Sequence, residues 1–527
     1  MPMTSVTSDI PALSPRDQYN QQLADNVHPA NWINPQPKPM YDMVVIGAGT
    51  AGLVCAAGAA GLGAKVALIE RGLMGGDCLN VGCVPSKALI RASRAVADIR
   101  TAGDLGVRVS GTVEADFGQV MERMRKLRAG LSDHDSVSRF SELGVDVFIG
   151  DGTFIDGRSV SVNGTILRFK KAVIATGARA AVPPIPGLAE AGFLTNETVF
   201  SLTELPQRLA VIGAGPIGCE LAQAFARLGS KVIILARDGQ LMPREDSDAA
   251  AEVEKSLRRD GVNIQYGCKI KGVSRQGEDR IVELQYEDND RANVSSSVPS
   301  AAGGSEHVCV DQILIGVGRA PNVRGLNLEA AGVQYDQRSG VKVDDTMRTS
   351  NRRIFAAGDI CSQYKFTHAA DAMARIVIQN GLFFGRKKAT SITVPWCTYT
   401  EPEVAHVGLY AAEAQKRGIV FDTVRIELAG IDRAVLDGET AGFLKVHVER
   451  KRGRIIGATL VANHAGEMIS EITVAMAAGM SLESLGSIIH PYPTQAAIIK
   501  QAGDAYSRNR LTPRVKKLLR IIMAFNP

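Results

Sequence analysis

One pattern occurs twice in this chain, and it constrains the fold more than any other feature of the sequence. Residues 43–70 read MVVIGAGTAGLVCAAGAAGLGAKVALIE, and residues 209–237 read LAVIGAGPIGCELAQAFARLGSKVIILAR. Each copy predicts an apolar strand, a Gly-x-Gly-x-x-Gly turn, an alanine-rich helix and a second apolar strand. Two copies predict two doubly wound α/β domains, each built on a parallel sheet.

The glycines of each turn suit the diphosphate of a dinucleotide. In the first copy, Gly47 makes the tight turn, Gly49 lets the backbone approach a diphosphate, and Gly52 lets the helix pack closely. The diphosphate would then lie at the helix N-terminus, held by free N–H groups and the helix dipole. The corresponding residues of the second copy are Gly213, Gly215 and Gly218.

The residue that ends the second strand of each copy is placed to contact an adenosine ribose. In the first copy it is Glu70, which suits free ribose hydroxyls unless it simply faces solvent. In the second copy it is Ala236, followed by Arg237, whose guanidinium suits a 2′-phosphate. We therefore expect NADPH rather than NADH at the second site, with Arg244 either a second contact or an ordinary surface charge.

The rest of the chain predicts further domains. A length of 527 residues is too great for one core and indicates about three or four domains. Residues 146–178 alternate like short strands with glycine turns, and residues 288–306 predict a long surface loop. The remaining predicted elements are a strand within 353–360, an antiparallel hairpin at 443–462 and a helix at 465–479, the last two in an α+β domain.

Both ends of the sequence look like additions to these domains. Residues 1–38 form an extension in which HPANWINPQPKP has too many prolines for a regular element, although Trp32 suggests packing on the body. The tail RVKKLLRIIMAF is basic and apolar. We expect the tail to be a helix packed on its own protein or on a dimer mate, with contact to a membrane or another partner as the alternative.

Composition excludes some function classes. The net charge of +5 is spread over the whole chain, so no nucleic-acid partner is expected. The uncharged run at 43–64 has the length of a membrane span, but its glycines break it, and we expect no transmembrane segment. The first residues do not resemble a signal peptide, and the eight scattered cysteines do not resemble a secreted disulfide scaffold. These observations favour the cytoplasm.

Two of the cysteines, Cys78 and Cys83, lie in GGDCLNVGCVPSK. They could form a structural disulfide, bind a metal ion, or cycle between dithiol and disulfide as a redox pair. In a regular helix their Cα atoms would be about 8–9 Å apart, and a disulfide needs about 7 Å or less. A bonded pair therefore needs an irregular turn, which Gly82 and Pro85 fit, before a helix through SKALIRASRAVADI.

The surroundings of this cysteine pair favour redox chemistry. No histidine flanks it and no second pair has zinc-finger spacing, so no metal site is expected. A cysteine at the start of a helix has its thiolate stabilised by the helix dipole. A redox pair is therefore favoured over a structural disulfide without redox activity or two unrelated thiols.

Together, these motifs resemble the class I pyridine nucleotide–disulfide oxidoreductases, flavoenzymes that include dihydrolipoamide dehydrogenase, glutathione reductase and mercuric reductase. The matching stretches are VVIGAGTAG, GGDCLNVGCVPSKALI, IATGARAAVPPIPG, VIGAGPIGCELA, GVGRAPN and IFAAGDI, in the family's order. The resemblance implies a homodimer with FAD and NAD(P)H on opposite sides of the flavin ring. The implied parts are an extension (1–38), an FAD-binding domain (39–188), an NAD(P)H-binding domain (189–322), a central domain completing the FAD site (323–394), a dimerisation domain (395–515) and a tail (516–527).

The resemblance also implies roles for individual residues. Electrons would pass from NAD(P)H through the flavin to a Cys78–Cys83 disulfide, with Cys83 against the flavin and Cys78 attacking substrate. Lys87 and Glu220 match a pair near the flavin's reactive nitrogen. The implied FAD contacts are Gly47, Gly49, Gly52, Glu70, Thr176, Gly177, Gly358 and Asp359, and Arg319 of GVGRAPN is a further cofactor-binding candidate.

One segment departs from the family. Many members end with His-Pro-Thr followed by Glu, and this histidine, supplied across the dimer interface, is the acid/base for a thiol substrate. Here the segment reads HPYPTQAAIIK: Tyr492 takes the place of the histidine, Ala497 that of the glutamate, and His490 comes two residues early. On a strand, His490 would point to the same side as Tyr492, displaced by about 6–7 Å. The missing base disfavours turnover of lipoamide or glutathione.

The resemblance is therefore to the mercuric-reductase-like branch, although this chain lacks an N-terminal Cys-x-x-Cys and has no cysteine after Cys397. It implies an FAD-dependent, NADPH-preferring reductase. Its substrate would be a small molecule or metal ion: Hg(II), another soft metal, an oxidant or a disulfide. The alternative is dihydrolipoamide dehydrogenase with Tyr492 or His490 as an atypical base; a flavin-bearing sensor without turnover and a plain diaphorase are also open.

Overall fold

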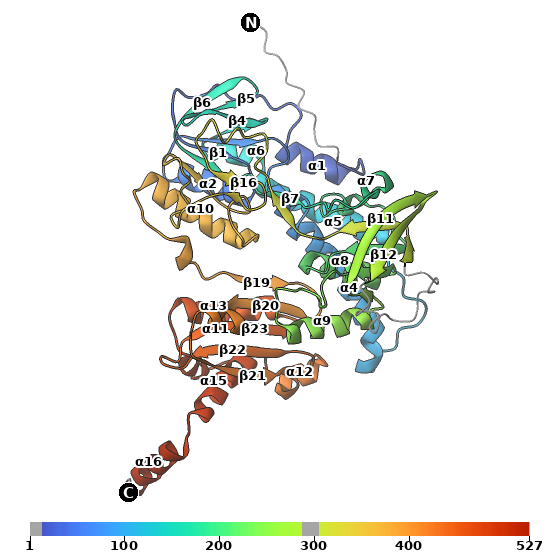
Figure 1. The fold of residues 1–527 in the computed structure, drawn as a ribbon, viewed down its shortest axis with the longest axis vertical. Coiled ribbons are helices and arrows are strands. Elements are labelled where there is room, and N and C mark those ends of the chain that lie inside the picture. Colours follow the sequence, from blue (N-terminus) through green and yellow to red (C-terminus); the bar gives the residue numbers. More distant parts are fainter. Residues whose placement is uncertain (1–12, 287–304, 526–527) are drawn as a thin grey trace. The chain divides into compact units, whose positions relative to one another are not determined.

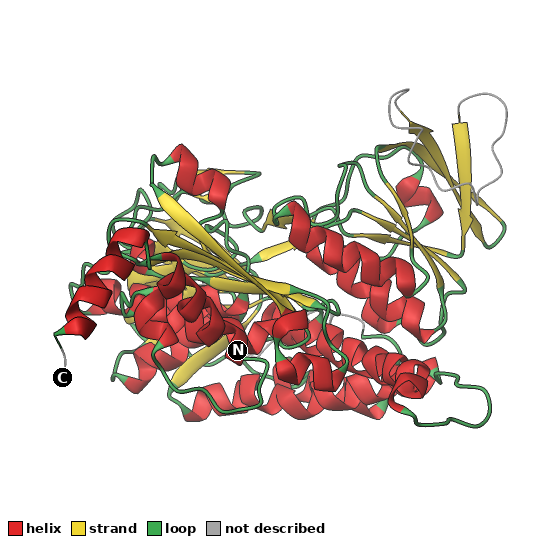
Figure 2. Cartoon of the chain, turned by 90° about the horizontal axis from the view of Figure 1, so that it is seen from below, coloured by secondary structure: helices red, strands yellow, loops and turns green. Residues whose placement is uncertain are grey.

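The structure is a computed structural model that describes residues 13–286 and 305–525, and the chain divides into two compact units. The first unit contains the chain up to Arg237 together with Gly261–Ile392, and the second contains Asp238–Asp260 and the chain from Thr393 onward. Figures 1 and 2 show that helices and strands are mixed along the chain. The predicted loop at 288–306 lies mostly outside the described residues, but Ser305 and Glu306 belong to a strand.

The first predicted α/β domain is confirmed. Its sheet is parallel in the order β3-β2-β1-β6, with β18 beside β6, and β6 continues into the antiparallel strands β5 and β4. The strands are β1 (Tyr41–Ile46), β2 (Val66–Glu70), β3 (Val145–Ile149), β4 (Gly152–Asp156), β5 (Ser159–Val162), β6 (Thr165–Ile174) and β18 (Ile354–Ala356). The run at 43–64 is strand, turn and helix, as its glycines predict, because α2 (Thr50–Gly61) follows β1.

The second α/β domain repeats this arrangement. Four parallel strands take the order β10-β9-β8-β14, and α8 (Pro216–Leu228) connects β8 to β9. A separate antiparallel sheet has the order β11-β12-β13. The strands are β8 (Arg208–Ile212), β9 (Lys231–Leu235), β10 (Asn263–Gln265), β11 (Cys268–Gln276), β12 (Asp279–Tyr286), β13 (Ser305–Val310) and β14 (Gln312–Ile315).

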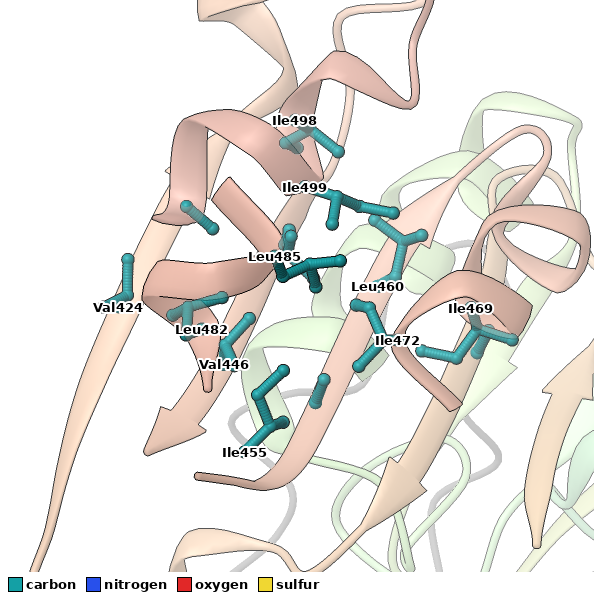
Figure 3. Close-up of a cluster of buried hydrophobic side chains, with 14 of the residues drawn as sticks. Val424, Val446, Ile455, Leu460, Ile469, Ile472, Leu482, Leu485, Ile498 and Ile499 are labelled. Carbon is teal, nitrogen blue, oxygen red and sulfur yellow. The ribbon is translucent and has the colours of Figure 1, made fainter. Parts of the chain in front are cut away.

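The second unit is built on an antiparallel sheet of order β19-β20-β23-β22-β21. Its strands are β19 (Pro395–Thr398), β20 (Glu403–Gly408), β21 (Phe421–Glu427), β22 (Phe443–Glu449) and β23 (Ile455–Ala462). Side chains from these strands meet side chains from α13 (Ala465–Ala477), α14 (Leu482–Gly486) and α15 (Ala497–Asn509) in one buried cluster (Figure 3). The predicted hairpin and the helix after it are therefore confirmed as β22–β23 and α13.

Buried polar contacts attach Asp238–Asp260 to this sheet. The Glu245 carboxylate is 9% exposed and accepts hydrogen bonds from Trp396 Nε1, at 2.9 Å, and from the Tyr410 hydroxyl. Burial raises the pKa of Glu245, and the two donors oppose that rise. Lys445 adds ion pairs to Asp246 and Asp248. This segment therefore forms one body with the C-terminal sheet.

The N-terminal extension is more ordered than its sequence predicts. It contains a helix, α1 (Gln18–Val27), which no pattern in the sequence had indicated. The proline-rich stretch after α1 has no regular element, as expected. Trp32 Nε1 donates to the Val147 carbonyl at 3.1 Å, which confirms that this stretch packs on the body.

The tail is a helix, α16 (Pro513–Ala524), as expected, but it does not pack on its own protein. All residues at 508–525 are exposed, and Figure 1 shows α16 standing clear of α15. The Thr512 hydroxyl accepts a hydrogen bond from Val515 N and starts a new helix instead of continuing α15. The expectation of packing within this chain is therefore wrong. Among the described residues, no helix is both long and apolar enough to cross a bilayer.

Candidate active site

The first glycine turn is packed so closely that side chains have no room. Gly47 has φ +100°, and a Cβ there would lie 2.5 Å from the Ala175 carbonyl oxygen. A Cβ on Gly52 would lie 1.8 Å from the Gly47 carbonyl oxygen. Helix α2 begins after Gly49, where no described side chain caps its free N–H groups. This bare helix start fits the diphosphate of FAD.

Glu70, at the end of β2, holds the glycine turn in place. Its Oε2 accepts a hydrogen bond from Ala48 N at 2.7 Å, and its Oε1 accepts one from Gly72 N at 2.8 Å. Burial raises the pKa of Glu70, and the two backbone donors oppose that rise. Glu70 therefore does not simply face solvent. Each carboxylate oxygen also keeps a lone pair that suits a ribose hydroxyl.

The other implied FAD contacts follow the neighbouring strands β6 and β18. Thr176 and Gly177 come just after β6, and Gly358 and Asp359 come just after β18. These two strands and β1 are parallel and adjacent, so their carboxyl ends meet at one edge of the sheet. In open α/β sheets, ligands bind outside this edge. The sheet order thus gathers the implied FAD residues.

Arg319 connects two acidic groups near this edge. It lies at the start of β15 (Arg319–Pro321), forms an ion pair with Asp77, and its Nε lies 3.2 Å from Asp359 Oδ2. It also donates to the Ala178 carbonyl at 2.7 Å. Burial raises the pKa of Asp359, and Arg319 opposes that rise. The structure thus shows Arg319 holding carboxylates, one of them beside Cys78 in the sequence.

The cysteine pair lies at a break between two helices; Gly82 is part of this break, whereas Pro85 lies in the first turn of the second helix. Helix α3 (Gly76–Asn80) carries Cys78, and Cys83 is the first residue of α4 (Cys83–Thr101). Both cysteines are free thiols. Thr367 Oγ1 lies 3.6 Å from Cys83 Sγ and begins α10 (Thr367–Leu382). No sequence motif pointed to Thr367; the packing of α10 beside α2 brings it here.

The environment distinguishes the two thiols. A hydrogen bond from Cys78 lowers the pKa of Cys83, and Thr367 and the Lys87 charge lower it further, against the effect of burial. The same hydrogen bond, together with burial, raises the pKa of Cys78. The two thiols therefore differ: the pKa of Cys83 is lowered and that of Cys78 is raised.

Lys87 and Glu220 form the ion pair suggested by their motifs. Lys87 Nζ lies 2.7 Å from Glu220 Oε2, and Glu220 is 6% exposed. Lys87 is four residues after Cys83, so both lie on the same side of α4. The pair joins α4 of the first α/β domain to α8 of the second, and its two charges act on the pKa of Cys83 in opposite directions: Lys87 lowers it and Glu220 raises it.

The second glycine turn repeats the first. Gly213 has φ +107°, and a Cβ on Gly218 would lie 2.4 Å from the Gly213 carbonyl oxygen. Helix α8 follows Gly215, where again no side chain of the described chain caps the helix start. Ala236 is buried and Arg237 is exposed. Arg244 is also exposed, and it belongs to the other compact unit.

The atypical C-terminal segment is a loop, and the strand geometry considered for it is wrong. His490 Nε2 lies 2.7 Å from Glu471 Oε1, and Nδ1 lies 2.9 Å from the Ile488 carbonyl oxygen. Tyr492 is 78% exposed, and its hydroxyl donates to Asp432 Oδ2 at 2.9 Å. This carboxylate raises the pKa of Tyr492. The directions of the His490 and Tyr492 side chains are therefore set by their contacts to Glu471 and Asp432, not by the alternation of side chains along a strand.

One buried arginine links the N-terminal extension to the helix that carries Cys78. Arg128, on α5 (Phe117–Leu131), is 4% exposed. Its Nη1 donates to the Asn80 carbonyl at 2.7 Å, and its Nη2 donates to Asn20 Oδ1 of α1 at 2.6 Å. Burial lowers the pKa of Arg128 to about 10. The extension thus supports the end of α3.

We expect Arg128→Met to destabilise the protein by about 2–3 kcal/mol, because two buried acceptors would lose their charged donor. The measurement is denaturant unfolding of the purified protein. The matched control is Arg123→Met, an exposed arginine on the same helix, which should change stability by about 0.5 kcal/mol or less. Equal effects of the two substitutions would contradict a special role for Arg128.

Metal ligands do not cluster in the structure: within residues 13–286 and 305–525, no group of three or more His, Cys, Asp or Glu side chains could hold a metal ion.

The comparisons with known proteins agree with this geometry. The family model described as "Pyridine nucleotide-disulphide oxidoreductase" matches residues 41–374, and the dimerisation-domain model of the same family matches residues 394–502. A mercuric reductase from Staphylococcus aureus is 35% identical over 470 residues, which cover 89% of this chain and 83% of the relative. A dihydrolipoyl dehydrogenase from Geobacillus stearothermophilus is 33% identical over 473 residues, covering 88% and 95%.

Solved structures give the same result. The Cu(II) complex of the HOCl-induced flavoprotein disulfide reductase RclA from Escherichia coli has a TM-score of 0.75 and 29% identity. The match covers 87% of this chain and 98% of that one. LpdA from Mycobacterium tuberculosis has a TM-score of 0.77 and 26% identity, with coverage of 88% and 99%.

Proposed function

This chain belongs to the class I pyridine nucleotide–disulfide oxidoreductases, a family of flavoprotein oxidoreductases that use FAD and a pyridine nucleotide, and we propose that it is an NADPH-dependent reductase acting through Cys78 and Cys83. The observation that supports this most is the asymmetry of the pair: a hydrogen bond from Cys78 lowers the pKa of Cys83. Asymmetric thiols suit a pair in which one sulfur stays with the cofactor and the other meets the substrate.

In this proposal, one set of residues binds the two cofactors and another passes electrons to the acceptor. The two glycine turns, Glu70 and the edge residues Thr176, Gly177, Gly358 and Asp359 would hold the FAD and NADPH, and Arg319 would orient Asp359. When bound, FAD would supply a two-electron carrier between the nicotinamide and the sulfur pair. Cys83 would hold the thiolate, stabilised by Thr367 and Lys87, while Cys78 attacks the acceptor. In the step with the acceptor, the Cys83 thiolate and the Cys78 thiol would become a disulfide, releasing one proton and giving two electrons to the acceptor, and two electrons from NADPH would then reduce the disulfide again.

The acceptor that we propose is a soft metal ion or a strong oxidant. Thiolates prefer soft ions, and the relatives include a mercuric reductase and a reductase that is HOCl-induced and was solved with Cu(II). Tyr492 donates to Asp432, and no histidine stands at its position to serve as base for a thiol substrate. A metal ion needs no such base, which makes it the better match.

The second candidate is dihydrolipoamide dehydrogenase, and one contact favours it. His490 Nε2 lies 2.7 Å from Glu471 Oε1, and this His–Glu pair could take the place of the family's usual His–Glu acid/base pair. However, the Ile488 carbonyl lies 2.9 Å from His490 Nδ1, so both ring nitrogens already have a partner within this chain.

The proposal also covers the oligomeric state, the location, the domain boundaries and the nucleotide contact of Arg237. We propose a homodimer through the dimerisation domain, a cytoplasmic location, and the six-part domain division with boundaries at residues 38, 188, 322, 394 and 515. We also propose that Arg237 contacts the 2′-phosphate of NADPH, since it is exposed two residues after β9 and Ala236 stands where a ribose-binding carboxylate would be.

The experiment that tests the function measures purified holoenzyme with NADPH or NADH and a panel of acceptors: Hg(II), Cu(II), hypochlorite, lipoamide and glutathione disulfide. We expect a soft metal or hypochlorite to be reduced faster than either disulfide, and NADPH to be preferred. Arg237→Ala should raise KM for NADPH roughly 10-fold or more, the equivalent of one charge-assisted phosphate contact, with little effect on NADH. Fast lipoamide turnover with NADH would overturn the proposal in favour of the second candidate.

A further inference from the structure

The C-terminal helix α16 contributes nothing to the fold of its own unit. Every residue at 508–525 is exposed, including Leu518, Ile522 and Phe525. An amphipathic helix in water normally buries its apolar stripe. Here the stripe faces solvent along its whole length, so its function lies outside the contacts described for this unit.

The sequence of α16 separates into two faces. Val515, Leu518, Leu519 and Ile522 recur at i, i+3, i+4 and i+7, which places them on one side of the helix. Lys516, Lys517 and Arg520 occupy the opposite arc. After Asp504 the chain has no acidic residue; its basic residues there are Arg508, Arg510, Arg514, Lys516, Lys517 and Arg520.

We propose that α16 is an interfacial helix that binds the enzyme to the surface of an anionic phospholipid bilayer. A helix that lies in the plane of an interface needs an apolar face and a polar face rich in lysine and arginine, and α16 has both. Anionic lipids attract each nearby basic residue by about 1 kcal/mol. The helix has 12 residues and is far too short to span the bilayer.

A second copy of this chain is a poorer partner for the same face. Pairing two copies of α16 through their apolar stripes would leave both basic arcs facing water, with no acidic residue after Asp504 to neutralise them. A lipid surface supplies the missing negative charge and accepts the apolar stripe at the same time. Charge complementarity therefore favours the bilayer.

The test is co-sedimentation of full-length holoenzyme with vesicles. Vesicles of phosphatidylcholine with about a third phosphatidylserine should bind the protein, and pure phosphatidylcholine should bind it far less. Replacing Lys516, Lys517 and Arg520 by Gln should lower the partition coefficient on the order of 100-fold, from about 1 kcal/mol per charge. Leu518→Glu combined with Ile522→Glu should abolish binding.

The matched control is Val420→Glu, which adds a charge at another exposed apolar side chain of the same unit. It should leave vesicle binding unchanged, and all variants should oxidise NADPH at the wild-type rate. Equal binding to neutral and anionic vesicles, or no binding to either, would overturn the proposal. So would a change from dimer to monomer in the Leu518/Ile522 variant by sedimentation, which would identify a second copy as the partner.

Discussion

Replacing either Cys78 or Cys83 by Ser should abolish reduction of the true acceptor, by roughly 10³-fold or more, while slow oxidation of NADPH by dioxygen continues. The reason is that acceptor reduction needs both sulfurs, whereas a bound flavin with NADPH can react with oxygen without them. The measurement compares the two rates in each variant. A comparable loss of both rates would indicate a structural role for the pair.

The pH dependence gives this prediction a second readout. Because the pKa of Cys83 is lowered, its thiolate should persist in the reduced enzyme to pH values well below the ordinary pKa of a cysteine. It should be lost only as the pH falls through that lowered value. Cys78→Ala removes the hydrogen bond that lowers the pKa, so the thiolate should then disappear at higher pH, whereas Cys78→Ser keeps a donor.

The thiolate can be followed by the long-wavelength absorbance expected of a thiolate beside a flavin. Cys309→Ser is the control, since Cys309 is an exposed thiol outside the candidate active site. It should change neither the rates nor the spectrum. A titration curve of the wild-type enzyme that coincides with that of an ordinary thiol would contradict the asymmetry on which the proposed function depends.

Local patterns accounted for the parts of the fold that depend on neighbours in sequence. The strand–turn–helix units, the helix break at Gly82 and the hairpin at 443–462 were all predictable, because backbone sterics and hydrophobic periodicity act over a few residues. The ion pair of Lys87 with Glu220 also followed from motifs, though only through the family resemblance.

What could not be predicted depends on contacts between distant segments. No sequence pattern near Arg128 indicates that it contacts both Asn20 of the extension and Asn80. In sequence, Arg128 is 108 residues from Asn20 and 48 residues from Asn80. Thr367 reaches Cys83 only because α10 packs beside α2. The exposure of α16 was missed for a related reason: an amphipathic pattern shows that one face is apolar, but not what covers it.

The second large effect is expected from a single methyl group on the first glycine turn. Gly52→Ala should prevent stable FAD binding, because its Cβ would lie 1.8 Å from the Gly47 carbonyl oxygen, and 3.4 Å from Val45 Cγ1. The clash is with backbone, so no side chain can move away to relieve it. A cost of about 3 kcal/mol, the upper end for an overpacked core, would weaken FAD binding roughly 100-fold. The measurement is the ratio of flavin to protein absorbance after purification.

The same helix supplies the control. A Cβ on Gly61, at the end of α2, would meet no described atom within 4 Å, so Gly61→Ala should keep its FAD and gain up to about 1 kcal/mol of stability. Gly218→Ala makes the equivalent clash in the second turn, at 2.4 Å from the Gly213 carbonyl oxygen, and should give a yellow protein that no longer oxidises NADPH. If Gly52→Ala instead lost NADPH binding and kept FAD, the assignment of the two nucleotides to the two turns would be reversed.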